Sequence, residues 1–242
     1  MRRVAKVPQL KGSNSTSELT GKATPMTTTI RALFLAGVLS AAYYTVALGQ
    51  DDETRSGPWI NFALGYGSAK VSCDTCRSGP HLDGWEGLIQ AGGTPSPHLR
   101  LGAGWEFFTH WLPDGETVRA LVTVSGSMYY YPRVTGGPFI EAELGLCDYR
   151  MLKGVHDGVL FLTGDTTYAQ GRGWGATTGV GYHFRVGREL SVAPRVAYTH
   201  GDIGTLHSGL LRVPPFHAPV ARGWKQNVVS VVLNVGMAQS PN

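Results

Sequence analysis

From residue 57 onward, the sequence is dominated by stretches in which bulky apolar residues alternate with small or polar ones. The clearest stretch alternates Ile60, Phe62, Leu64 and Tyr66 with Asn61, Ala63, Gly65 and Gly67. Successive side chains of a β-strand point to opposite faces of its sheet. An apolar face that opposes a set of small and polar residues suits a barrel with lipid outside and a polar interior. The pattern therefore predicts a transmembrane β-barrel.

Eight stretches of this kind are expected to form strands. They cover residues 58–69, 82–93, 98–111, 116–131, 137–150, 173–186, 189–200 and 225–238. Most run for 10 to 14 residues, which exceeds the roughly 5–6 residues of a typical soluble strand and suits a tilted membrane crossing. We expect an all-β protein, an eight-stranded antiparallel up-and-down barrel.

The connections between these stretches differ in length in a regular way. Residues 70–81, 151–172 and 201–224 form long connections, and residues 94–97, 132–136 and 187–188 form short ones. Periplasmic turns of such barrels are short and extracellular loops are longer, so both termini are expected in the periplasm. The connection at residues 112–115 is short although it belongs to the outer side. Pro194 lies inside the seventh stretch and lacks an N–H donor, which predicts a local bulge.

The first 49 residues look like an export segment. Residues 32–49 carry no charge, follow Arg31 and end in Ala47-Leu48-Gly49, as a cleavable signal peptide does. A single membrane anchor is the alternative. We expect residues 1–25 to be a disordered leader or a mis-assigned start ahead of Met26, residues 26–49 to be the signal peptide and residues 50–242 the barrel domain.

The basic character of the chain belongs to that leader. Residues 1–49 hold six of the 21 Lys and Arg residues and one of the 17 acids, so 15 basic and 16 acidic side chains remain. A net charge of about −1 lacks the excess of basic residues that indicates nucleic-acid binding. No cofactor motif is recognised.

Several segments resemble bacterial outer-membrane β-barrel proteins of the OmpA/OmpX-like eight-stranded class. They are residues 59–67 followed by Ser72-Cys73-Asp74-Thr75-Cys76, Tyr131-Pro132 with Gly137-Pro138-Phe139, Gly179-Val180-Gly181-Tyr182, and residues 185–191. The resemblance covers about residues 57–238 and implies architecture and an outer-membrane location, without an activity. It also implies contact with outer-membrane lipid and lipopolysaccharide, and with the barrel-insertion machinery. The chain departs from the class because residues 235–242 lack a terminal aromatic assembly signal.

Alternation places nine charged or titratable side chains in the lumen. They are Glu86, Arg100, Glu106, Arg119, Glu141, Glu143, His183, Arg185 and Arg195. An eight-stranded barrel has an interior that side chains just fill, so opposite charges there must pair or be solvated. We interpret the set as a salt-bridge network that plugs the barrel. A proton path, an ion path or a catalytic cluster is the alternative.

The three cysteines raise a separate question. Cys73 and Cys76 form a lone CxxC in the first outer connection. Zinc needs about four ligands, and exported proteins favour disulfides, so a disulfide within the motif is the leading hypothesis. Cys147 leaves an odd count and pairs with Cys73 or Cys76 in one alternative, and a metal or redox site at the CxxC is another.

Tryptophan and tyrosine gather near strand ends or on the apolar face. We expect them to form a girdle at the membrane boundary, where such rings sit between acyl chains and headgroups. The set comprises Trp59, Trp85, Trp105, Trp111, Trp174, Trp224, Tyr66, Tyr130, Tyr182 and Tyr198.

The expected function is structural or surface-interacting, through an extracellular ligand bound at the long outer connections. Two rivals stand beside it. One is a lipid A-modifying hydrolase or acyltransferase, for which Ser127, His183 or His200 could be nominated. The other is a secreted lipocalin-like barrel, which would carry the apolar set inside and the charges outside.

Overall fold

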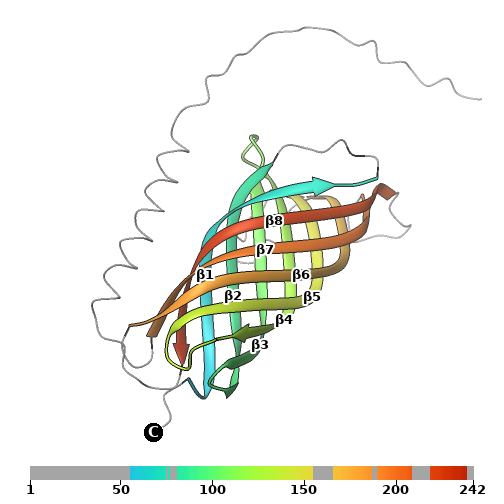
Figure 1. The fold of residues 1–242 in the computed structure, drawn as a ribbon. Coiled ribbons are helices and arrows are strands. Elements are labelled where there is room, and N and C mark those ends of the chain that lie inside the picture. Colours follow the sequence, from blue (N-terminus) through green and yellow to red (C-terminus); the bar gives the residue numbers. More distant parts are fainter. Residues whose placement is uncertain are drawn as a thin grey trace, which may run out of the picture. The chain divides into compact units, whose positions relative to one another are not determined.

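The structure is a computed structural model that describes residues 55–74, 76, 81–154, 166–186, 190–208 and 219–238. Eight strands form a closed antiparallel barrel in which sequence neighbours pair and β1 pairs with β8 (Figure 1). The strands are β1 (Pro58–Ser72), β2 (Leu82–Ser96), β3 (Leu99–Trp111), β4 (Thr117–Tyr130), β5 (Gly137–Lys153), β6 (Thr166–Val186), β7 (Leu190–His207) and β8 (Pro219–Ala238). The predicted fold is confirmed.

Other sequence-based predictions concern residues outside this range. The leader at residues 1–25 and the signal peptide at residues 26–49 lie outside the described residues. Within the part of the chain that the structure describes, no helix is long and apolar enough to span a membrane.

The bulky apolar residues face outward. Leu64, Leu144 and Leu146 are 56%, 66% and 74% exposed, whereas the alternating polar residues are buried. On β5 this apolar band runs over the nine residues Pro138–Leu146, the length that a tilted strand needs to cross a bilayer. A lipocalin-like barrel would have the opposite polarity and is excluded. The chain is an outer-membrane type of β-barrel, apolar toward lipid.

Six strands are longer than predicted: β1, β2 and β5 by three residues, and β6, β7 and β8 by six or seven. β6 begins at Thr166 rather than at residue 173, β7 ends at His207 rather than at residue 200, and β8 begins at Pro219 rather than at residue 225. The hydrophobic pattern reverses in these extensions, because Ala169, Ile203 and Leu206 face inward and are buried. Strand pairing continues beyond the apolar band, so the change of pattern marks the band's edge and not the strand end. The long outer connections are correspondingly shorter, at residues 154–165 and 208–218.

The predicted bulge at Pro194 is wrong. Pro194 pairs with Leu233 of β8 in an unbroken register. On the β6 side, the register is the same before and after it, at Gly181–Arg195 and Phe184–Val192, and the pairs between them are missing. Because proline has no N–H donor, two residue pairs between β7 and β6 are lost here, but β7 contains no extra residue as a bulge would require.

Most residues of the predicted aromatic girdle face outward, as a girdle requires, and two do not. Trp85, Trp111 and Trp174 are between 43% and 48% exposed on the outward face. Trp59 is 3% exposed and lies inside the barrel, and Trp224 packs against inward-facing apolar residues. Both residues occupy inward-facing positions in the alternation of their strands. This alternation decides their orientation, although both lie near strand ends.

The close packing of neighbouring strands can be tested by comparing two glycines, one in a crowded position and one in an open position. A Cβ added at Gly145 would lie 2.0 Å from the Val124 carbonyl oxygen, whereas one added at Gly126 would meet nothing nearer than the Gly102 carbonyl oxygen at 4.0 Å. We therefore expect Gly145→Ala to impair barrel closure and Gly126→Ala to leave it unchanged. The measurement is heat-modifiable migration on a gel after refolding into detergent. Equal folded fractions for the two variants would contradict the observed strand packing.

Candidate functional site: the charged layer of the lumen

The interior of the barrel is divided into three layers. The outer end is filled by apolar side chains, here called the outer apolar plug: Ala69, Val71, Leu82, Phe108, Leu121, Cys147, Tyr149, Ala169, Ile203, Leu206 and Val228. The periplasmic end holds a cluster of four aromatic residues and one alanine: Trp59, Tyr129, Tyr131, Phe139 and Ala193. Charged residues lie between them. The prediction of a polar interior therefore holds for the middle of the barrel and fails at its outer end.

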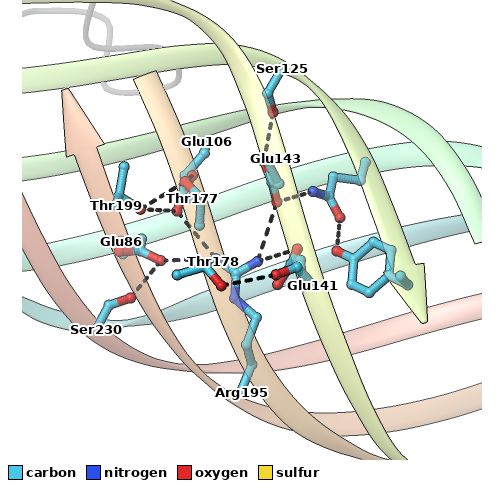
Figure 2. A network of polar contacts seen from close by, with 12 residues as sticks. Glu86, Glu106, Ser125, Glu141, Glu143, Thr177, Thr178, Arg195, Thr199 and Ser230 are labelled. Carbon is cyan, nitrogen blue, oxygen red and sulfur yellow. Dashed lines mark hydrogen bonds and ion pairs between the residues drawn. The ribbon is translucent and has the colours of Figure 1, made fainter. Parts of the chain in front are cut away.

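The middle layer is organised around Arg195 of β7, whose side chain is fully buried. Its Nη1 donates to Oε1 of Glu141 at 2.9 Å and lies 3.7 Å from Oε1 of Glu143. Its Nη2 lies 3.2 Å from Oε1 of Glu106 and 3.5 Å from Oε1 of Glu86 (Figure 2). These five residues, the central charge cluster, come from β2, β3, β5 and β7. The cluster therefore joins the paired strands β2 and β3 to β5 and to β7, with which they share no ladder.

Neutral side chains complete the hydrogen bonding of the carboxyl groups. Glu143 accepts from Gln90 Nε2 and from Ser125 Oγ, both at 2.6 Å, and the Tyr129 hydroxyl donates to the side-chain Oε1 of Gln90. Ser230 Oγ donates to Glu86 at 2.9 Å.

The hydroxyl groups of Thr177 and Thr199 donate to Glu106 at 3.1 and 3.3 Å (Figure 2). Buried carboxyl groups are tolerated when their lone pairs are satisfied in this way.

One guanidinium cannot neutralise four carboxylates. If all were ionised, the central charge cluster would carry a net charge of −3 in an environment that bulk water does not reach. Neighbouring carboxyl groups in a buried site can lower such a charge by sharing a proton.

A cationic group lies at the periplasmic end. Arg55, which precedes β1, is 1% exposed; its Nη1 donates to the Arg133 carbonyl at 2.6 Å and its Nη2 to the Gly136 carbonyl at 2.7 Å. Its guanidinium lies 3.8 Å from the centroid of the Tyr131 ring, and Arg100 lies 5.6 Å from the same ring. Burial lowers the pKa of Arg55 to about 10, so it remains protonated at neutral pH. Arg55 therefore ties the chain before β1 across the periplasmic mouth.

The nine predicted lumen residues thus do not form one network. Glu86, Glu106, Glu141, Glu143 and Arg195 meet in the central charge cluster. The others are distributed along the axis. Arg100, His183 and Arg185 belong to the periplasmic end, where they are close enough to Arg55 to interact electrostatically. Arg119 lies at the outer end, near Tyr149.

The structure joins Cys73 and Cys76 in a disulfide and leaves Cys147 as a buried free thiol. Cys147 faces the lumen, with its Sγ 3.1 Å from the hydroxyl of Thr123. The Asp74 amide within the disulfide loop donates to the Arg222 carbonyl at 3.0 Å. The loop is therefore held against the outer end of β8. Among the described residues, no group of three or more His, Cys, Asp or Glu side chains is arranged to hold a metal ion.

The residues nominated for a hydrolase lie on different faces and levels. Ser127 is buried inside the barrel, opposite Glu143 on β5. His183 is buried beside Tyr131 at the periplasmic end. His200 lies on the outward face, where its ring is 5.5 Å from that of Trp174. These three cannot act on one substrate, because a nucleophile and its base must be within hydrogen-bonding reach.

The sequence did not identify several residues that hydrogen-bond the central charge cluster or hold the periplasmic mouth. Gln90, Ser125, Thr177, Thr199 and Ser230 occupy inward positions of the alternation, which was a usable signal for each of them. Arg55 lies outside every strand and gave no such signal.

Comparisons with known proteins add solved barrels of similar architecture. Neisserial surface protein A is 17% identical, with a TM-score of 0.47 over 74% of this chain and 97% of that one. The attachment invasion locus protein of Yersinia pestis is 8% identical, with a TM-score of 0.45 over 75% and 99%. Outer membrane protein OprG from Pseudomonas aeruginosa is 11% identical, with a TM-score of 0.39 over 78% and 99%. No family model and no curated protein matches the sequence. Likenesses this weak carry no information on ligand or activity.

The central charge cluster predicts a large effect for loss of its only cation. We expect Arg195→Leu to lower the free energy of unfolding by about 3–5 kcal/mol, because the buried carboxyl groups lose their partner. Urea unfolding in lipid vesicles measures this. Arg133→Gln, at an exposed turn position, is the matched control and should change little. A loss below about 1 kcal/mol for Arg195→Leu would contradict a stabilising cluster.

The contacts of Arg55 predict a local effect at the periplasmic mouth. In Arg55→Gln, the carbonyls of Arg133 and Gly136 lose a charged donor. We expect faster amide hydrogen exchange in the turn at residues 131–136, with no change in the outer apolar plug. Unchanged exchange in that turn would show that Arg55 does not hold the mouth closed.

Proposed function

We propose that this protein is an exported, non-conducting outer-membrane barrel with a structural or surface-interaction role carried by its outer connections. The observation that supports it is the filled lumen. A barrel whose interior is closed at three levels offers no passage and no internal ligand site, so contacts with other molecules fall to its exterior.

The packing inside the barrel supports closure. Phe108, Leu121 and Ile203 in the outer apolar plug are 2% to 4% exposed. A space beside Glu106 and Thr199 and another beside His183 and Tyr131 at the periplasmic end each measure about 10 Å³. That is room for a single water molecule.

The outer rim supports a role in recognition. The strand extensions of β6, β7 and β8 carry the wall beyond the apolar band, and the disulfide loop at Cys73–Cys76 is fixed to β8. Connections 73–81, 154–165 and 208–218 emerge from this rim. Surface loops on a rigid scaffold are where binding residues concentrate, so an extracellular ligand is proposed to bind there.

We propose a non-enzymatic role. A lipid A-modifying hydrolase would require a nucleophile, a base and an orienting acid that meet at the outer rim. Ser127, His183 and His200 do not meet, and the carboxyl groups of the central charge cluster are sealed from lipid and solvent.

Electrical recording tests the closed lumen. Planar bilayers with the purified barrel should show no stable conductance, because three layers of packed side chains obstruct the axis. A variant that removes bulk from the outer apolar plug, Phe108→Ala with Leu121→Ala, serves as a positive comparison for increased leak. A stable porin-like current in the unaltered protein would overturn the proposal.

The surface role is tested by altering one outer connection. Replacing residues 155–165 with a short Gly-Ser turn should reduce adhesion of expressing bacteria to epithelial monolayers while heat-modifiable migration stays normal. Arg133→Gln, a change at the exposed periplasmic turn, is the control. Normal adhesion of the loop variant, together with weakened resistance of the envelope to detergent in a deletion strain, would favour a purely structural role.

A further inference from the structure

Two outward-facing arginines lie at the edge of the apolar band on neighbouring strands. The last apolar pair across β5 and β6 is Leu146 with Trp174, which are 74% and 48% exposed. The next outward pair is Asp148 with Arg172, and Arg150 follows on β5. The wall therefore changes from apolar to charged within two residues, about 7 Å of strand.

Asp148 holds both guanidinium groups in place. Arg150 binds it through Nε at 3.1 Å and Nη2 at 2.9 Å. Arg172 binds it through Nε at 3.2 Å, and the Arg172 side chain is 77% exposed. The Arg150 side chain is only 16% exposed, so Arg172 is the residue that presents oriented N–H donors at the level where lipid headgroups begin.

A hollow opens outward on the same wall, nearer the middle of the band. It measures about 370 Å³ and is lined by residues of β3, β4 and β5 that include Leu101, Gly126, Met128 and Leu144. Gly126 leaves it open, since nothing but the Gly102 carbonyl oxygen lies within 4.0 Å of a Cβ built there. Leu144 lies four residues from Asp148 on β5, roughly 13 Å along the strand. This is less than the depth of one leaflet, about 15 Å.

We propose that Arg172 and the hollow together bind one phosphate-bearing anionic lipid. The phosphate contacts the guanidinium of Arg172, which Asp148 orients, and an acyl chain follows the outward face of β5 into the hollow. Arginine suits this ligand because its planar donors match phosphate oxygens. The acyl chain covers apolar surface that the small residue at position 126 leaves recessed. The inference rests on the membrane placement proposed above and is independent of the outer connections.

Native mass spectrometry of the barrel, released from vesicles of equal parts phosphatidylglycerol and phosphatidylcholine, tests the site. The unaltered protein should retain phosphatidylglycerol preferentially. Arg172→Gln should weaken that preference roughly fivefold, the effect of one basic residue near a charged membrane surface. Lys153→Gln is the matched control, because Lys153 is an exposed cation of the same strand, paired with Glu116 at 3.1 Å. It should retain the preference.

A second variant tests the hollow without touching charge. Gly126→Leu should fill it and reduce the number of retained lipids, while Gly126→Ala should not. Equal retention of the two lipids by the unaltered protein, or equal effects of Arg172→Gln and Lys153→Gln, would overturn the site. Displacement of phosphatidylglycerol by inorganic phosphate would show a free-anion site instead of a lipid site. Failure of the protein to insert into vesicles would refute the membrane placement itself.

Discussion

Hydrocarbon offers no hydrogen-bond partner to a peptide backbone, and this constraint determines the architecture of the protein. A strand placed in lipid must pair on both sides, which only a closed sheet allows. The ladder between β1 and β8 closes the sheet over fourteen residue pairs, from Trp59–Ala238 to Ser72–Lys225. Once the sheet is closed, each residue has two possible environments, lipid or lumen, and the alternation of the sequence distributes the side chains between them.

The lumen then becomes the place where polar residues must be accommodated. Its middle is too narrow for bulk water, so Arg195 and the four glutamates satisfy one another with help from serine, threonine, glutamine and tyrosine. The outer end follows the opposite rule. There the wall rises beyond the apolar band, water replaces lipid outside, and apolar residues such as Phe108 and Ile203 turn inward. The protein thus has an inverted polarity within the membrane and the polarity of a soluble barrel above it.

This change of environment also explains what could be predicted from the sequence. Strand number, closure and inward phase followed from two-residue alternation, which is strong where one neighbour is lipid. The ends of β6, β7 and β8 were missed because the pattern reverses at the band's edge while pairing continues.

The central charge cluster was predicted as part of a larger set. Alternation tells which face a residue occupies, but its level along the barrel axis depends on register. That is why Arg100 and Arg119 were grouped with Arg195, although they lie toward opposite ends. Arg55 could not be found, since its role depends on turn carbonyls that come from residues far away in sequence.

The central claim is that lipid, and not protein, surrounds the outward apolar residues. The most direct test places nitroxide spin labels at Leu64, Val124 and Leu146 in vesicle-inserted protein and measures collision with oxygen and with a water-soluble nickel complex. The account predicts high oxygen accessibility and low nickel accessibility at all three positions. Labels that are shielded from both reagents would place these residues in a protein core and contradict it.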